Sequence, residues 1–147
     1  MKVSLQRLDD DFHFQATNDT GNTIEMDASP DDGGQGAGVR PMQLMLMGLG
    51  GCSGIDVISI LKKARQDVQD FAIELEAERA EGEVPSLFTH ILVHYRLTGS
   101  LREEAVRRAI ELSLEKYCSV AKLLEKTATI TYAFTINGTR YEPQAQP

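Results

Sequence analysis

The stretch Pro41–Leu61, PMQLMLMGLGGCSGIDVISIL, is the longest apolar run of the chain and contains Cys52, one of its two cysteines. It is too long for an ordinary strand, and a proline at its start suits the first turn of a helix. A helix that accepts glycines, each costing about 1 kcal/mol relative to alanine, usually needs another backbone or a ligand close by. The stretch therefore predicts a buried central helix that presents a thiol. Its glycines are Gly48, Gly50, Gly51 and Gly54.

The composition is that of a globular chain: 147 residues, 41% of them hydrophobic, are most simply one domain over residues 1–147 with its own core. The net charge of −7 argues against nucleic-acid partners and anionic membrane surfaces, both of which need a basic face. Gln43 and Asp56 fall inside the apolar run and argue against a membrane span. The acidic opening MKVSLQRLDDDF lacks the apolar region of a secretory signal peptide.

The cysteine count bears on the compartment. Two cysteines are too few for a secreted disulfide scaffold, and Cys52 and Cys118 lack the spacing of a zinc motif. We therefore expect a cytoplasmic protein without metal or cofactor, in which a cysteine is either a small core residue or a reactive thiol.

Alternating apolar and polar residues mark the strands of the first third of the chain. Residues 2–27 alternate in this way between turn-forming residues, which predicts an antiparallel meander. Residues 29–38, SPDDGGQGAG, have the composition of a flexible loop and lack the order of a phosphate-binding motif. The helix that begins at Pro41 is expected to continue through residues 62–68, whose basic side chains suit a helix C-terminus.

The middle of the chain predicts a long hairpin. Residues 71–79 and 87–97 alternate as strands do, with a Gly- and Pro-containing turn between them. His90 and His94 would chelate a metal if they lay on a helix. On a strand they are separated by about 13 Å, so ordinary strand surface is favoured over a metal site.

The last third predicts a helix, a short helical segment, a strand and a tail. Ser100, with Glu103 three residues later, predicts a capping box at the start of a helix that ends near Tyr117. Cys118 ends this helix or begins the next short one. A last strand follows, and residues 141–147 are expected to form a frayed tail.

The chemistry of the two cysteines depends on what would stabilise a thiolate. A helix N-terminus or a nearby cation favours it, and apolar burial opposes it. Cys118 is expected near a helix start, whereas Cys52 lies well inside its helix and needs an external cation. Arg40, at the helix entrance, is the nearest candidate in the sequence. The residues alone leave two alternatives, a pair of buried structural thiols or a reacting pair.

Two segments together resemble the OsmC/Ohr family of osmotically inducible and organic-hydroperoxide-resistance proteins. They are GVRPMQLMLMGLGGCSGIDVISILKKAR, residues 38–65, and EKYCSVAKLLEKTATI, residues 115–130. The resemblance covers most of the chain and its elements come in the same order. It implies an α+β fold with antiparallel sheets and a buried central helix, in an intertwined homodimer with its active sites at the subunit interface.

The resemblance also implies a reaction. Cys52 is similar in position to the cysteine that attacks a hydroperoxide and becomes a sulfenic acid. Cys118 is similar to the resolving cysteine, which forms a disulfide that an external thiol reductant reopens. The family supports the first cysteine with a glutamate and an arginine. Here Met42 stands at the glutamate position, and its neighbour Gln43 is neutral. Arg7 and Arg40 are the arginines that precede Cys52.

Two alternatives to a peroxidase remain open on the same fold. One is a binding or sensing protein whose apolar interface pocket holds a small ligand, since Met42, Met45 and Met47 stand where peroxidases place polar residues. The other is a structural dimer with inert thiols.

Overall fold

The computed structural model describes residues 1–143, which fold as two compact units: Met1–Met47 and a second unit that begins at Gly48. The assignment of residues 1–147 to one domain stays a prediction. Of the expected tail, Tyr141 belongs to a strand and residues 144–147 lie outside the described residues.

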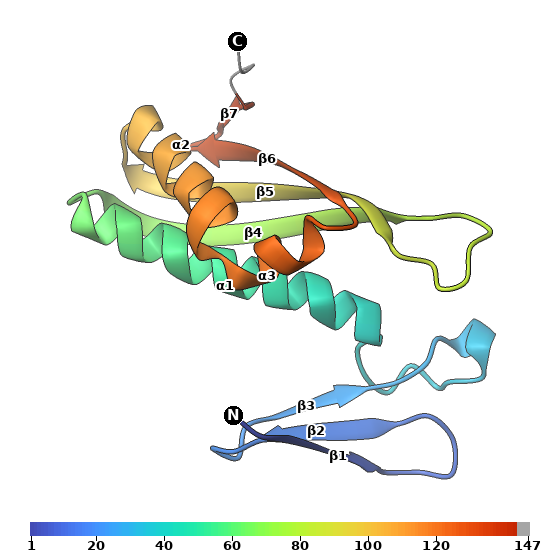
Figure 1. Ribbon diagram of the computed structural model, residues 1–147. Helices are drawn as coiled ribbons and strands as arrows, with labels where there is room; N and C mark the ends of the chain where they lie inside the picture. The colour runs from blue at the N-terminus through green and yellow to red at the C-terminus, as the bar shows by residue number, and fades with distance from the viewer. Residues whose placement is uncertain (144–147) are drawn as a thin grey trace. The chain divides into compact units, whose positions relative to one another are not determined.

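The first unit is built on a three-stranded antiparallel sheet of order β1-β2-β3, which confirms the predicted meander (Figure 1). Side chains alternate across its two faces, as the period of two in the sequence requires. The strands are β1 (Val3–Arg7), β2 (Phe14–Asn18) and β3 (Thr23–Met26).

The loop after β3 is held at two points by Asp27. Its carboxylate accepts hydrogen bonds from the backbone amides of Ala28 at 2.7 Å, and of Gln35 and Ala37 at 3.0 Å each. The 3-10 turn η1 (Pro30–Asp32) lies between these anchors. The loop over residues 29–38 thus has a defined backbone, and its expected flexibility stays a prediction.

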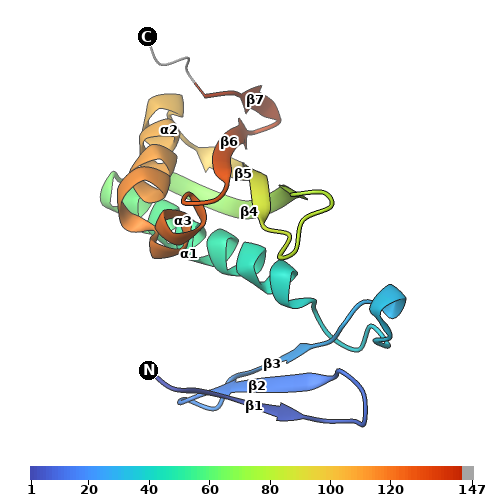
Figure 2. The ribbon, with the colours of Figure 1, turned by 45° about the vertical axis from the view of Figure 1, so that its right-hand side comes forward.

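The second unit holds a four-stranded sheet of order β4-β5-β6-β7 with helices on one face (Figures 1 and 2). The β4–β5 hairpin is antiparallel as predicted, but β6 pairs with β5 in parallel, so this sheet is mixed rather than purely antiparallel. A parallel neighbour requires a crossover, and the helices that carry Cys118 provide it. The elements are α1 (Pro41–Lys63), β4 (Asp67–Arg79), β5 (Phe88–Ser100), α2 (Glu103–Leu112), the π-turn η2 (Ser113–Tyr117), α3 (Ser119–Leu124), β6 (Thr129–Ile136) and β7 (Thr139–Tyr141).

Helix α1 ends earlier than predicted. The Arg65 amide donates to the Lys62 carbonyl, the Gln66 amide donates to the Leu61 carbonyl, and Arg65 has a φ of 55°. This is a Schellman motif, which satisfies the last carbonyls of the helix. The sequence signal was missed because the motif usually carries glycine at the position of Arg65. The residues that follow from Asp67 belong to strand β4 (Asp67–Arg79) and not to the helix.

The start of α2 also differs from the prediction. Ser100 is the last residue of β5, and Arg102 occupies the N-cap position. Among the described residues, no side chain caps this helix with a hydrogen bond to its first turn. Instead, the Arg102 amide is held by the side chain of Gln66 at 2.9 Å. The expected capping box is therefore wrong.

One face of α1 packs against β4 of the same chain. A Cβ added to Gly50 would lie 2.9 Å from a methyl group of Leu75, and one added to Gly54 would lie 2.9 Å from a methyl group of Ile73. These two glycines therefore serve close packing on the chain's own sheet. The close neighbour that the sequence predicts for the glycines is, for this pair, a side chain of the same chain.

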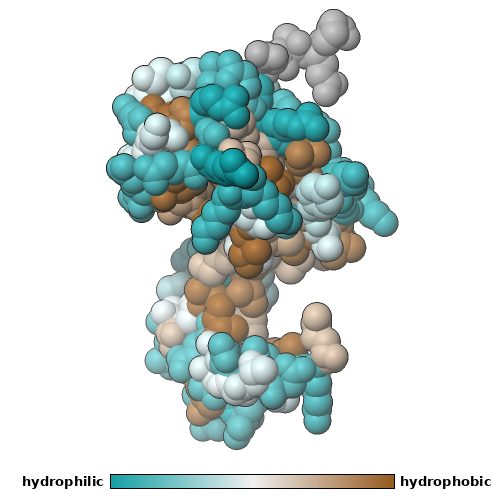
Figure 3. Space-filling view, turned by 90° about the vertical axis from the view of Figure 1, so that its left-hand side faces the viewer, coloured by the Kyte–Doolittle hydropathy of each residue, from teal (hydrophilic) through white to brown (hydrophobic). Residues whose placement is uncertain are grey.

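The opposite face of α1 remains uncovered in the single chain. No described atom lies within 4 Å of a Cβ added to Gly48 or Gly51, and Ile55 is 72% exposed. The space-filling view shows apolar side chains at the surface between hydrophilic ones (Figure 3). Among the described residues, α1 is also the one helix long and apolar enough to cross a membrane. Its packing on β4 identifies it as a core helix. The predicted burial of this helix is only partly met in the single chain, because its own chain covers one face and leaves the other exposed.

Candidate functional site

The two cysteines of the chain meet in the second unit. The sulfur of Cys52, on α1, and the sulfur of Cys118, after η2, lie within 4.8 Å of each other and of a carboxylate oxygen of Asp56. Cys52 is half-buried and Cys118 is fully buried. Both thiols are free. The pairing of cysteines expected from the sequence is therefore present within a single chain.

Local backbone geometry positions Cys118. The π-turn η2 closes with a hydrogen bond of 2.8 Å from the Cys118 amide to the Ser113 carbonyl, and Cys118 then caps the N-terminus of α3. Its sulfur accepts a hydrogen bond of 3.4 Å from the Ala121 amide. Burial nevertheless raises the pKa of the Cys118 thiol to about 11, with the nearby Cys52 adding to the shift and the Ala121 amide opposing it. Cys118 is therefore a neutral thiol at neutral pH.

Asp56 is tied to the segment that carries Cys118. The hydroxyl of Ser113, which is fully buried, donates to Oδ2 of Asp56 at 3.1 Å and approaches the Ser53 carbonyl at 3.4 Å. These contacts join α1 to η2. Because Asp56 follows Cys52 by one helical turn, the carboxylate and both sulfurs share one side of α1.

A buried tyrosine borders the same cluster. Tyr95, on β5, is fully buried, and its hydroxyl has no hydrogen-bond partner among the described residues. Burial raises the pKa of Tyr95 well above its ordinary value; Cys118 and Asp56 raise it further, and the nearby Ser53 hydroxyl opposes the shift. A buried hydroxyl without a hydrogen-bond partner is uncommon in a folded protein.

The third predicted site residue, Arg40, lies elsewhere along the chain. It immediately precedes α1, and its backbone amide donates to the side chain of Gln43 at 3.1 Å. Gln43 thus satisfies an amide at the helix entrance. Cys52 is twelve residues further on, about 18 Å along the helix axis at the usual rise of 1.5 Å per residue. No contact of the Arg40 guanidinium with either cysteine is present among the described residues.

The histidines weighed as a metal pair are ordinary strand residues. His90 and His94 lie on β5 and each contacts a threonine hydroxyl of β6, Thr131 at 3.0 Å and Thr135 at 2.8 Å. These contacts span the parallel strand pair. The strand placement predicted from the alternation is confirmed.

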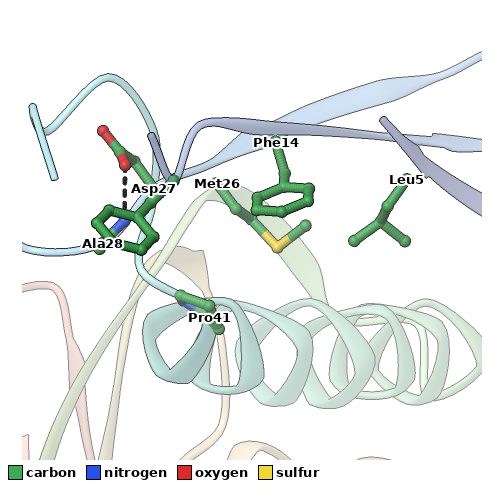
Figure 4. A pocket seen from close by; sticks show the side chains of 7 residues that line it. Leu5, Phe14, Met26, Asp27, Ala28 and Pro41 are labelled. Carbon is green, nitrogen blue, oxygen red and sulfur yellow. Dashed lines mark hydrogen bonds between the residues drawn. The ribbon is translucent and has the colours of Figure 1, made fainter. Parts of the chain in front are cut away.

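The first unit contains an apolar pocket of about 340 Å³. Phe14 and Met26 lie side by side within it, and Pro41 closes it at the start of α1 (Figure 4). The methionines that motivated an apolar pocket in the sequence do not line it. The apolar lining is formed by Leu5, Phe12, Phe14, Met26, Ala28 and Pro41.

Sequence reasoning found both cysteines, and the spacing of four between Cys52 and Asp56 predicts that the carboxylate can face the same side of the helix as the thiol. It missed two other residues of their surroundings. Ser113 and Tyr95 carried no signal, because a single serine in a helix and a tyrosine in a strand are common. Their roles depend on tertiary contacts.

Comparisons with known proteins point to one family. The family model described as "OsmC-like protein" matches residues 33–133, more than half of the chain. Protein YhfA of Escherichia coli strain K12 is 48% identical over 124 residues, which cover 84% of this chain and 89% of that protein.

Solved structures agree with this match. A hypothetical protein from Aquifex aeolicus VF5 has a TM-score of 0.80 at 33% identity, covering 92% of this chain and 95% of the other. An organic hydroperoxide resistance protein OsmC from Legionella pneumophila has a TM-score of 0.70 at 13% identity, covering 92% and 97%. At that low identity the second likeness shows the fold alone.

Proposed function

This chain belongs to the OsmC-like protein family, and from that premise we propose that it is a thiol-dependent hydroperoxide reductase. The observation that carries the proposal is the approach of the Cys52 and Cys118 sulfurs to within 4.8 Å. A disulfide needs an S–S bond of about 2.05 Å, so the two sulfurs have to move closer together as the bond forms. Support from similar structures comes from the organic hydroperoxide resistance protein of Legionella pneumophila, which has the same fold.

The first step takes place at the half-buried thiol. The Cys52 thiolate attacks the O–O bond of a hydroperoxide; an S–O bond forms, the O–O bond breaks, and the alkoxide takes a proton and leaves as an alcohol. Cys52 is then a sulfenic acid. The greater exposure of Cys52 relative to Cys118 makes it the cysteine that a substrate can reach.

The second step joins the two sulfurs. The Cys118 sulfur attacks the Cys52 sulfur; the S–S bond forms, the S–O bond breaks, and hydroxide leaves as water with the proton that Cys118 gave up. Asp56 lies within 4.8 Å of both sulfurs and carries that proton between them. This role fits a resolving thiol whose raised pKa keeps it protonated. An external dithiol then reduces the disulfide, and its own two thiols become oxidised.

The cation that favours a Cys52 thiolate is assigned to Arg40. It is an exposed arginine that immediately precedes the helix that carries Cys52. Arg7 is the matched alternative in β1. We expect Arg40→Ala to slow sulfenic acid formation while Arg7→Ala leaves it unchanged. If Arg7→Ala slowed sulfenic acid formation and Arg40→Ala did not, the cation would be Arg7 instead.

A homodimer is the proposed assembly. Gly48, Gly51 and Ile55 recur at three- and four-residue spacing on one uncovered face of α1, which suits close packing against a second α1. Ile55→Glu should therefore convert the dimer to a monomer in sedimentation velocity. Leu123→Glu, at a residue of similar exposure on α3, is the control and should leave the dimer intact. A monomeric wild type would contradict the assembly.

The cytoplasm is the proposed location, because a working dithiol needs a reducing compartment. A second function, binding of a small apolar ligand, is favoured by the pocket between Phe14 and Met26 in the first unit. Native mass spectrometry of freshly purified protein tests it. A retained ligand that is lost in Phe14→Asp supports binding, and repeated preparations without a ligand count against it.

Peroxide consumption with dithiothreitol or a lipoylated carrier tests the main proposal. Wild type should consume hydroperoxide many times faster than Cys52→Ser. In a separate experiment without reductant, Cys118→Ser should consume one equivalent of hydroperoxide and then stop with a sulfenic acid that dimedone traps. Wild-type turnover no faster than that of Cys52→Ser would remove the proposal.

A further inference from the structure

We propose that in the reduced protein Cys52, Asp56 and Cys118 bind one divalent metal ion of the zinc type. Each residue offers one donor atom, and the three atoms lie within 4.8 Å of one another. Two come from successive turns of α1 and the third from the segment between η2 and α3. Thiolates with a carboxylate are donors that zinc accepts in proteins.

The spacing fits a single ion with little movement. Zinc binds sulfur at about 2.3 Å and carboxylate oxygen at about 2.0–2.2 Å, so two tetrahedral ligands are separated by about 3.5–3.8 Å. The three donors, already within 4.8 Å of one another, reach that separation by small side-chain rotations. Cys52 and Asp56 are four residues apart on α1, the spacing at which two helical side chains share one ion.

A supporting contact fixes the carboxylate. The buried Ser113 hydroxyl donates to Oδ2 of Asp56 at 3.1 Å, which leaves the other carboxylate oxygen free to bind an ion. Ligating carboxylates in metal sites are commonly hydrogen-bonded in this way. Ser113 also accepts the Cys118 amide through its carbonyl, so one residue positions two of the three ligands.

The unpaired hydroxyl of Tyr95 is a second, independent observation. It is fully buried, lacks a hydrogen-bond partner among the described residues, and borders the cluster that contains Asp56 and Cys118. A tetrahedral ion with three protein ligands takes a water in its fourth position. That water would accept the hydrogen bond that the Tyr95 hydroxyl otherwise lacks.

Charge favours a dication at this point. With both thiols ionised the three ligands carry a charge of −3, which a divalent cation reduces to −1. Metal binding and disulfide formation use the same sulfurs and exclude each other, yet binding requires no peroxide chemistry and does not rest on the proposed function.

Cobalt titration of the fully reduced protein, without peroxide, tests the site. We expect one Co²⁺ per chain with the intense thiolate-to-metal absorption of a tetrahedral site, displaced by Zn²⁺. Cys52→Ser and Cys118→Ser should each weaken this absorption. Asp56→Asn should lower the affinity by more than the roughly 10- to 100-fold expected for Ser113→Ala, which loses only a supporting contact. Asp70→Asn, an exposed carboxylate on β4, is the control and should bind as wild type does.

A measurement on the wild type guards against misfolded variants. Stoichiometric Zn²⁺ should slow the alkylation of Cys52 at least tenfold, and a chelator should restore it. Absence of thiolate-to-cobalt absorption at stoichiometric Co²⁺ would overturn the proposal. Equal affinity in Asp56→Asn and wild type would overturn it as well, because two cysteines alone would then account for binding. Metal binding without peroxidase activity would separate this inference from the proposed function.

Discussion

The hydroxyl of Ser113 donates a hydrogen bond of 3.1 Å to the carboxylate of Asp56. Through this contact the π-turn that precedes Cys118 is tied to the helix that carries Cys52. No disulfide joins the two sulfurs, so their approach depends on the elements that carry them. The hydrogen bond between Ser113 and Asp56 is one contact between these elements, and a single substitution removes it.

Ser113→Ala should destabilise the protein. A hydrogen bond to a charged group contributes roughly 1.5–3 kcal/mol, and the loss should appear as a lower urea midpoint with an unchanged slope. Ser4→Ala, at an exposed position on β1, is the matched control and should change stability little. Equal stability of the two variants would show that the Ser113 contact carries no free energy of folding.

Gly99→Ala should be strongly destabilising. Gly99 has a φ of 135° at the irregular end of the β4–β5 pairing, and an added Cβ would collide with the backbone carbonyl of Asp67. Strain and overpacking together predict a cost of roughly 2–5 kcal/mol by urea denaturation. Gly138→Ala has a positive φ but no described atom within 4 Å, so only about 1–2 kcal/mol of backbone strain is expected. A larger cost at Gly138 would contradict this packing.

Asp27→Asn should loosen the loop over residues 29–38. The hydrogen bonds from Ala37, Gln35 and Ala28 lower the pKa of Asp27 in spite of burial, the Ala37 contact most of all. A lowered folded pKa means that the stabilisation is complete above the ordinary value of 3.8 and is lost as pH falls through the folded pKa. Limited proteolysis at neutral pH should cut this loop faster in Asp27→Asn than in Asp31→Asn, the exposed control. Equal cutting would contradict the anchoring.

Cys118 should respond to alkaline pH. Its pKa is raised from 9.0 to about 11, so the folded protein retains a proton that the unfolded chain releases. The contribution of the Cys118 thiol to the free energy of unfolding is therefore fully present below pH 9, and it declines as the pH rises towards about 11. The fall in urea midpoint over this window should be smaller in Cys118→Ser. In the folded wild type, alkylation of Cys118 should likewise accelerate over the same window. Fast alkylation of Cys118 at neutral pH would contradict its buried, protonated state.

Much of the fold was predictable because its signals are local. The alternation of apolar and polar residues over residues 2–27 and in the β4–β5 hairpin predicts strands and shows which side chains share a face. The long apolar run predicts helix α1. The parallel pairing of β5 with β6 was not predictable from alternation, since both pairings have the same period. The end of α1 was missed because Arg65 adopts the left-handed conformation that glycine normally signals.

Of the candidate site, the sequence predicted the two cysteines. Cys52 and Cys118 were paired through their resemblance to family motifs, and the structure brings them together. Asp56 follows Cys52 by one helical turn, a spacing that the sequence itself contains. Ser113 and Tyr95 lie on other elements and reach the site through tertiary packing, which no spacing in the sequence encodes. The role of Arg40 depends on how a second copy is placed, which lies beyond the local patterns of one chain.

The product of oxidation tests the central claim most directly. The reduced protein is treated with one equivalent of an organic hydroperoxide per chain, blocked with an alkylating reagent, and mapped by peptide mass spectrometry without reduction. The account predicts an intrachain Cys52–Cys118 disulfide, formed as the peroxide is consumed and absent in Cys52→Ser. Two free thiols after exposure to peroxide, or a disulfide that links two chains, would contradict it.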